Sequence, residues 1–168
     1  YGGQYLGCPT YAAAMANNGF WDKHSYRFVA EHTGAVKSVR WYNRTGSGYS
    51  VGNGGSVQIS IQTDSGGFPS GLKIGTTGAY AGAATLGTFP VFTFTTQPQL
   101  TYGTTYHLVF QQVNSSQGKT SVTDLHDYTA PPDGLSIFPL QKPTLASIRY
   151  QNSAWLVMPG YLPIYELT

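Results

Sequence analysis

Short stretches of alternating apolar and polar residues run along the chain from His24 onward. The clearest lies at 57–62, where Val57, Ile59 and Ile61 alternate with glutamine and serine. A period of two predicts a strand that buries one face and exposes the other. The same pattern, in weaker form, predicts strands at 26–31, 36–44, 72–75, 90–95, 104–113, 121–124, 135–140, 145–150, 154–158 and 162–167. No segment predicts a long helix.

Glycine and proline clusters separate these strands. The Asp-Ser-Gly-Gly and Pro-Ser-Gly segments at 64–67 and 69–71 predict turns, and the glycine-rich segments 45–55 and 76–88 predict loops. Residues 1–22 are expected to be irregular, with one helical turn at 12–16. Many short strands separated by long loops predict an all-β fold, a jelly-roll-like β-sandwich of two sheets that forms one domain over 1–168.

Composition and charge narrow the classes of function. Charged residues make up 10% of the chain, and the net charge is +2. No two basic residues are adjacent, which argues against nucleic-acid binding, and no apolar stretch of about 18 residues exists to cross a membrane. The abundance of glycine, tyrosine and uncharged polar residues favours a secreted, extracellular domain. Because the sequence begins at Tyr1, we expect a processed product or an excised fragment.

Motifs for metal binding are weak. The four histidines lack the spacing of a zinc helix, and the single cysteine, Cys8, has no partner in the chain and is expected to be a buried small apolar residue. The densest group of ligand types is Asp124, His126 and Asp127, in an expected polar loop. Its carboxylates could hold a structural calcium ion, but no cofactor is required.

Catalysis has little support in the sequence. The Gly-Tyr-Ser-Val-Gly segment at 48–52 matches a nucleophile elbow, yet no helix is expected after it, so we interpret it as a chance match. A small polysaccharide lyase that uses Tyr/His chemistry is one alternative. It would need a cleft in which His107 or His126 approaches a tyrosine and an arginine such as Arg40.

Aromatic side chains beside polar ones are the stronger signal. The apolar face of a pyranose ring stacks on tryptophan or tyrosine, while its hydroxyls bond to polar side chains. Trp41 is expected in the core. Tyr42, flanked by two arginines, would suit a sugar that carries a carboxylate, although the same residues could form an ordinary solvated face. The candidate ligand-binding residues are Trp21, Lys23, Arg40, Tyr42, Arg44, Tyr49, Arg149, Trp155 and Tyr161.

A resemblance to a known group rests on framework segments. These are Tyr-Arg-Phe at 26–28, Val-Lys-Ser-Val at 36–39, and the segments 54–64, 69–71, 100–110 and 155–167. Over residues 24–168 the chain resembles β-sandwich carbohydrate-binding modules of secreted bacterial enzymes, in particular those attached to enzymes that attack xanthan or alginate. The matching motifs belong to strands and turns, and binding residues cannot be matched one by one.

The resemblance implies a secreted, non-catalytic and monomeric module. Its partner would be a polysaccharide, with anionic polymers such as xanthan among the candidates, and it would be tethered to a catalytic domain. A structural or adhesive surface domain is a further alternative, which would carry a large apolar contact patch and form stable oligomers.

Overall fold

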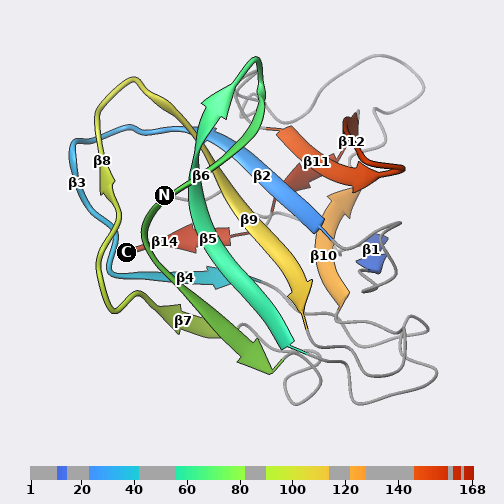
Figure 1. Ribbon diagram of the computed structural model, residues 1–168, viewed down its shortest axis with the longest axis horizontal. Helices are drawn as coiled ribbons and strands as arrows, with labels where there is room; N and C mark the ends of the chain where they lie inside the picture. Colours follow the sequence, from blue (N-terminus) through green and yellow to red (C-terminus); the bar gives the residue numbers. More distant parts are fainter. Residues whose placement is uncertain are drawn as a thin grey trace.

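A computed structural model describes residues 11–14, 23–41, 56–81, 90–113, 122–127, 146–158, 161–163 and 165–168 of the chain. These residues form strands joined by turns and bends (Figure 1). The strands are β1 (Tyr11–Ala14), β2 (Lys23–Val29), β3 (Gly34–Ala35), β4 (Ser38–Trp41), β5 (Ser56–Ser65), β6 (Phe68–Ala81), β7 (Val91–Thr93), β8 (Gln99–Leu100), β9 (Thr105–Val113), β10 (Val122–Asp127), β11 (Ala146–Gln151), β12 (Ala154–Met158), β13 (Tyr161–Pro163) and β14 (Tyr165–Leu167).

The main layer is a six-stranded sheet in the order β12-β11-β2-β9-β5-β6, in which every neighbouring pair is antiparallel. Alternate residues of its central strands point to one side and are apolar. They include Tyr26 and Phe28 on β2, Leu108 and Phe110 on β9, and Ile59 and Ile61 on β5, all buried. Burying this surface is the main driving force for folding. The strands and inward-facing apolar residues predicted at 26–31, 57–62 and 104–113 are therefore confirmed. The expected exposure of the opposite face is wrong over much of β5 and β9, where Ser60, Gln62 and His107 are also buried.

A three-stranded sheet in the order β14-β4-β7 packs against this apolar face. The Trp41 ring lies 5.4 Å from Phe110, and the Tyr165 ring lies 5.7 Å from Tyr26. Burial raises the pKa of the Tyr165 hydroxyl above its ordinary value, as expected for a phenol inside the core. Two sheets that share one apolar core form a β-sandwich, so the predicted all-β fold is confirmed. The jelly-roll connectivity stays a prediction.

The β5–β6 hairpin corrects two expectations. Its turn is formed by Gly66 and Gly67, whose φ angles are 62° and 88°, and the predicted turn at 64–67 is confirmed there. The predicted turn at 69–71 is wrong, because those residues continue β6 past a shift in register next to Gly71, whose φ is 85°. Residues 76–81, expected to be a loop, also belong to β6. Small residues there allow close packing, since a Cβ on Gly78 would lie 2.0 Å from the Phe92 ring.

Smaller elements differ from expectation in several places. The expected strand at 162–167 is divided into β13 and β14, which belong to different sheets, and the expected strand at 135–140 lies outside the described residues. The expected strand at 36–44 is interrupted before β4, because Val36 and Lys37 bond to Pro98 and Thr168 outside any ladder. Residues 12–14 form part of β1 and not a helical turn, since β1 pairs with β10. The expected polar loop around Asp124 and Asp127 is likewise strand β10, paired with β1 and β13. The part of the chain that the structure describes contains no helix suited to crossing a membrane.

Candidate functional site

The side of the six-stranded sheet that faces away from the aromatic core carries mostly polar side chains, together with the buried Val109 and Ile148, and we call it the polar face. Register places side chains of neighbouring strands opposite each other across it. Arg27 on β2 lies opposite His107 on β9, and His107 lies opposite Gln62 on β5. The same strands therefore present an apolar side to the core and a polar side away from it.

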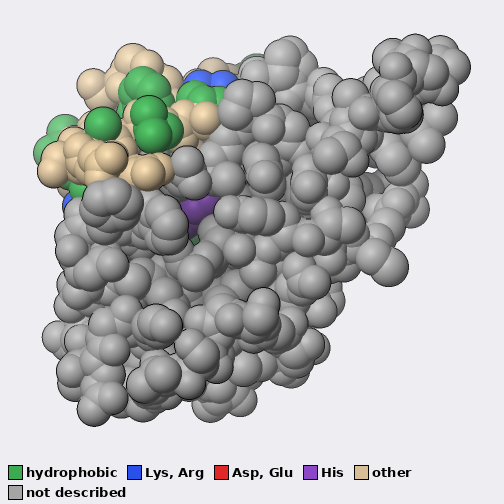
Figure 2. Space-filling model, turned by 90° about the vertical axis from the view of Figure 1, so that its right-hand side faces the viewer, with side chains coloured by type: hydrophobic (Ala, Val, Ile, Leu, Met, Phe, Trp, Pro, Cys, Tyr) green, Lys and Arg blue, Asp and Glu red, His purple; other side chains and the backbone are tan. Residues whose placement is uncertain are grey.

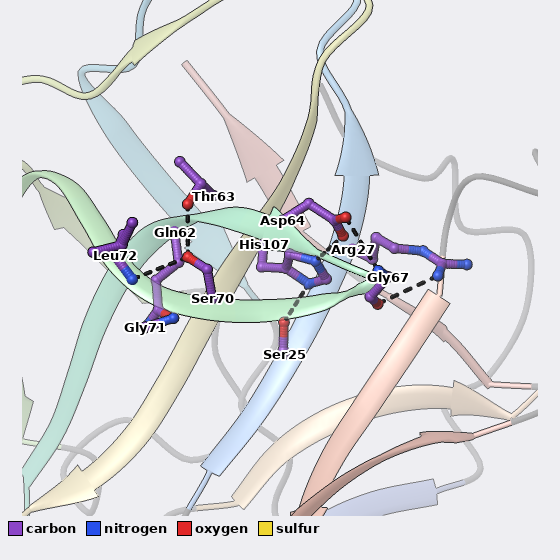
Figure 3. A network of polar contacts seen from close by, with 10 residues as sticks. All are labelled: Ser25, Arg27, Gln62, Thr63, Asp64, Gly67, Ser70, Gly71, Leu72 and His107. Atoms are coloured by element: carbon purple, nitrogen blue, oxygen red, sulfur yellow. Dashed lines mark hydrogen bonds and ion pairs between the residues drawn. The ribbon is translucent and has the colours of Figure 1, made fainter.

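A hydrogen-bonded cluster lies within the polar face, formed by Ser25, His107 and Asp64 from three adjacent strands (Figure 3). The Ser25 Oγ lies 3.2 Å from His107 Nδ1, and His107 Nε2 lies 2.7 Å from Asp64 Oδ1. The other carboxylate oxygen of Asp64 accepts a bond from the Gly67 N–H, 3.1 Å away. The carbonyl of Gly67 accepts from the Arg27 guanidinium at 3.4 Å. The cluster thereby fastens the β5–β6 turn to β2 and β9.

The pKa values of this cluster define its charge. Burial lowers the pKa of the His107 imidazole below its ordinary value and outweighs the opposite effect of Asp64. Burial alone would raise the pKa of the Asp64 carboxyl. The hydrogen bonds from His107 and Gly67, together with the positive charge of Arg27, instead hold that pKa below its ordinary value. A neutral imidazole thus donates Nε2–H to the carboxylate and accepts the Ser25 hydroxyl at Nδ1.

This cluster has the residue types of a hydrolytic triad, but its geometry assigns it to the framework. Ser25 and His107 are both 0% exposed, so a substrate cannot reach the hydroxyl. The solvent-accessible end of the chain of bonds is the carboxylate of Asp64, which is 26% exposed. The lyase alternative expects a tyrosine near His107, whereas both of its ring nitrogens are occupied by Ser25 and Asp64. The side chain of His126 lies outside the described residues.

A second group of residues on the polar face remains partly exposed. Tyr150 lies opposite Trp155 in the β11–β12 hairpin, and their ring centroids are 5.1 Å apart in an edge-to-face contact. The Lys23 ammonium sits 4.5 Å from the Tyr150 ring centroid. Register continues this row through Gln111 to Gln58. We call these five residues the aromatic–amide row, and each of them is neither fully buried nor fully exposed.

The row crosses five strands, from β12 to β5. Neighbouring strands are about 4.8 Å apart, so the row is roughly 19 Å long. Rings occupy one end of it, and the other end carries two amides, whose groups both donate and accept hydrogen bonds. Gln58 also accepts a bond from the Lys73 ammonium, 3.1 Å away. An extended ligand with apolar ring faces and many hydroxyls would match this order of groups.

The strands of the six-stranded sheet carry more basic than acidic residues. Its strands contain one acidic residue, Asp64, and four basic ones: Lys23, Arg27, Lys73 and Arg149. Asp64 is already bonded to His107. Lys23 and Lys73 contact a ring and an amide, and neither forms an ion pair in the described part of the chain. The sheet is therefore suited to an anionic or neutral ligand, and it disfavours a cationic one.

The edge of this sheet at β12 is partly apolar. Leu156 and Val157 are 44% and 45% exposed. Figure 2 shows the side of the molecule on which β11 and β12 lie in Figure 1. In its described part, hydrophobic side chains gather beside a basic one. The hairpin that carries Trp155 thus presents apolar groups at the surface.

The structure brings together two of the predicted site residues and separates a third. Lys23 and Trp155 meet through Tyr150, which the sequence analysis missed. Arg40 is exposed as expected, but it lies on β4 of the other sheet and forms an ion pair with Glu166. Arg149 and Tyr161 lie in β11 and β13 by backbone, and their side chains fall outside the described part. Trp21, Tyr42, Arg44 and Tyr49 lie outside the described residues, as does Cys8.

The described residues contain no candidate metal site. No three His, Cys, Asp or Glu side chains gather there in a way that could hold an ion. The side chains of Asp124 and Asp127 are outside this description, and the calcium site stays a prediction.

No protein-family model and no curated protein matches this chain.

Proposed function

We propose that this chain is a non-catalytic carbohydrate-binding module that holds a polysaccharide along the aromatic–amide row. The observation that supports this most is the arrangement at one end of the row. There the Lys23 ammonium lies over the Tyr150 ring, and Trp155 contacts the same ring edge-on. Rings fixed by such contacts lose little conformational freedom when a ligand binds.

Ring stacking would supply apolar contact in this site. Lys23 occupies one face of Tyr150, so we assign the main stacking surface to Trp155 and a supporting role to Tyr150. The hydroxyls of sugars further along would bond to Gln111 and Gln58, since amides provide both donors and acceptors. A site of this kind binds through several weak contacts and does not need a deep pocket.

The excess of basic residues favours an acidic polymer. Lys23 lies opposite Gln111, and Lys73 bonds to Gln58. Both ammonium groups could therefore meet the carboxylates of a sugar bound along the row. An exposed ammonium–carboxylate contact contributes up to about 1 kcal/mol and weakens with salt. Xanthan and alginate, which carry carboxylates, are therefore the first polymers to test.

The biological role follows from the resemblance of the sequence to modules of secreted enzymes. A module tethered to a catalytic domain raises the effective concentration of that domain near its polymer. We propose this targeting role for the chain, in an extracellular setting, with the module itself monomeric.

Affinity electrophoresis tests the proposal. The native protein is run through gels that contain xanthan, alginate, xylan or hydroxyethylcellulose, and its migration is compared with that in a plain gel. We expect retardation by at least one acidic polymer, a strong reduction of it in Trp155→Ala, and a smaller reduction in Lys23→Met. No retardation of folded protein by any of the four polymers would overturn the proposal.

Arg40→Gln is the matched control, because Arg40 is an exposed basic residue on the other sheet. We expect its retardation to equal that of the wild type. If Arg40→Gln abolishes retardation while Trp155→Ala does not, the polymer binds the β14-β4-β7 sheet, and the aromatic–amide row is not the site.

A further inference from the structure

A second aromatic side chain is presented to solvent at the other end of the sheet. Tyr102, in the turn between β8 and β9, is 71% exposed. Its ring makes no aromatic contact and no hydrogen bond in the described part of the chain. The fold therefore does not need this ring, because any side chain at position 102 would leave the core intact.

Four hydrogen bonds hold the backbone beneath the ring. All four N–H groups from Thr101 to Thr104 donate hydrogen bonds. The acceptors are the hydroxyls of Tyr106 and Thr33, 3.1 and 2.9 Å away, and the carbonyls of Ala30 and Thr101, 2.8 and 3.1 Å away. Gly103 has a φ of 76°, which a glycine adopts without strain. The turn is thus tied both to itself and to the segment that follows β2.

The surroundings of Tyr102 suit the binding of a sugar ring better than the binding of another protein. Thr101, Gly103 and Thr104 are exposed, as is the bend at 31–33, and none of these residues has a large apolar side chain. A stable protein–protein interface buries about 800 Å² on each side around an apolar centre. A pyranose needs one ring face with hydroxyl partners nearby, and the Thr33 hydroxyl next to the Tyr102 N–H is such a partner.

From these observations we infer that Tyr102 forms a second saccharide-stacking site, separate from the aromatic–amide row. This inference rests on the proposed function, since both sites would bind the same polysaccharide. Lys23 and Val29 mark the two ends of β2, and the Tyr102 turn bonds to Ala30, just beyond the second end. At about 3.3 Å per residue the two sites are roughly 23 Å apart.

Two sites at this separation would act together on a long polymer and separately on a short sugar. Once one site holds the polymer, the second binds at a high effective concentration, so avidity exceeds the affinity of either site. We expect Tyr102→Ala to weaken retention by polymer roughly tenfold or more, and Tyr102→Phe to retain it. Leu72→Ala is the matched control, because Leu72 is 70% exposed on β6, and it should behave like the wild type.

Backbone NMR spectra recorded with short oligosaccharides separate the two sites. The oligosaccharides are prepared from the polymer that retards the wild type most strongly. We expect the amide signals of Tyr102 and Gly103 to shift on titration, and to shift equally in Trp155→Ala. In Tyr102→Ala the amide signals of positions 102 and 103 should not shift on titration, while those of Tyr150 and Trp155 should still shift.

The outcomes distinguish this inference from the proposed function. If the Tyr150 and Trp155 signals shift in the wild type and those of Tyr102 and Gly103 do not, the second site is wrong and the proposed function stands. Equal retention of Tyr102→Ala and wild type by polymer would also overturn the second site. If none of the four polymers retards the wild type, both proposals fail together.

Discussion

The two faces of the six-stranded sheet use the same strands for different purposes. On the core face of β2 and β9, Tyr26 and Phe110 are fully buried with their rings 5.3 Å apart. On the polar face of the same strands, Ser25 and His107 are equally buried, but a directional hydrogen bond joins them. One face thus depends on apolar area removed from water, and the other depends on satisfied polar groups.

The comparison also extends along the polar face itself. In the hydrogen-bonded cluster, Ser25 and His107 are fully buried and the partly exposed Asp64 ties the β5–β6 turn in place. The aromatic–amide row is partly open to solvent along its whole length. Changes on the core face should therefore alter stability, and changes in the row should alter binding with little effect on stability.

The largest expected effect comes from comparing two tryptophans. Trp41 is 2% exposed and contacts Phe110, so Trp41→Ala should lower the free energy of unfolding by about 3–5 kcal/mol. Trp155 is partly exposed in an edge hairpin, and Trp155→Ala should lower it by at most about 1 kcal/mol. Urea unfolding followed by circular dichroism measures both. Similar losses for the two variants would contradict the distinction between the faces.

The packing of the two sheets can be tested at a glycine. A methyl group on Gly78 would overlap the Phe92 ring, so Gly78→Ala should destabilise the fold by about 1–3 kcal/mol. Gly34→Ala is the control, because nothing lies within 4 Å of a Cβ at that position. Equal midpoints for the two variants in urea would show that this contact does not constrain the sandwich.

The hydrogen-bonded pair of His107 and Asp64 predicts a pH dependence of stability. The folded protein keeps His107 neutral, while the unfolded chain protonates it near its ordinary pKa of 6.5. As the pH falls below that value the unfolded state takes up a proton that the folded state resists, so stability decreases. The lowered pKa of Asp64 has the same sign and adds a loss below about pH 3.8.

The variant His107→Gln measures how much of this pH dependence of stability comes from His107. His107→Gln should be less stable than the wild type at pH 7, and its stability should change less between pH 7 and pH 5. The free energy of unfolding at several pH values provides the comparison, and an unchanged slope in the variant would assign the titration to other groups.

The smallest expected change in stability is at Lys23. Its contact with Tyr150 is worth about 0.5–1 kcal/mol at a partly exposed site, so Lys23→Met should unfold at nearly the wild-type urea concentration. Retention by acidic polymers should nevertheless decrease, and retention by neutral ones should not. Equal decreases for both kinds of polymer would mean that Lys23 positions the rings without contacting carboxylates.

The sequence predicted the core face well because period-two alternation reports burial directly. Val39 and Trp41 were assigned to one side and Arg40 to the other, as the structure has them. Expectations failed where glycine and small residues continue a strand, as at 69–71 and 76–81. There the partner strand supplies the hydrogen bonds, and local turn propensity is overridden.

The polar face was much harder to predict. His107 and Asp64 are 43 residues apart, and the two-residue spacing of Ser25 and Arg27 says nothing about which strand lies alongside them. One signal was present in the sequence, the Asn152-Ser153 pair between two predicted strands. In the structure these residues form a two-residue hairpin turn with φ angles of 52° and 64°. Reading that turn would have placed Tyr150 opposite Trp155.

The most direct test of the account is affinity electrophoresis of Trp155→Ala in xanthan and alginate gels, with urea unfolding measured on the same preparation. The account predicts that the variant keeps a near wild-type free energy of unfolding and is retarded much less than the wild type. A stable variant that is retarded as strongly as the wild type would contradict the assignment of saccharide binding to the aromatic–amide row.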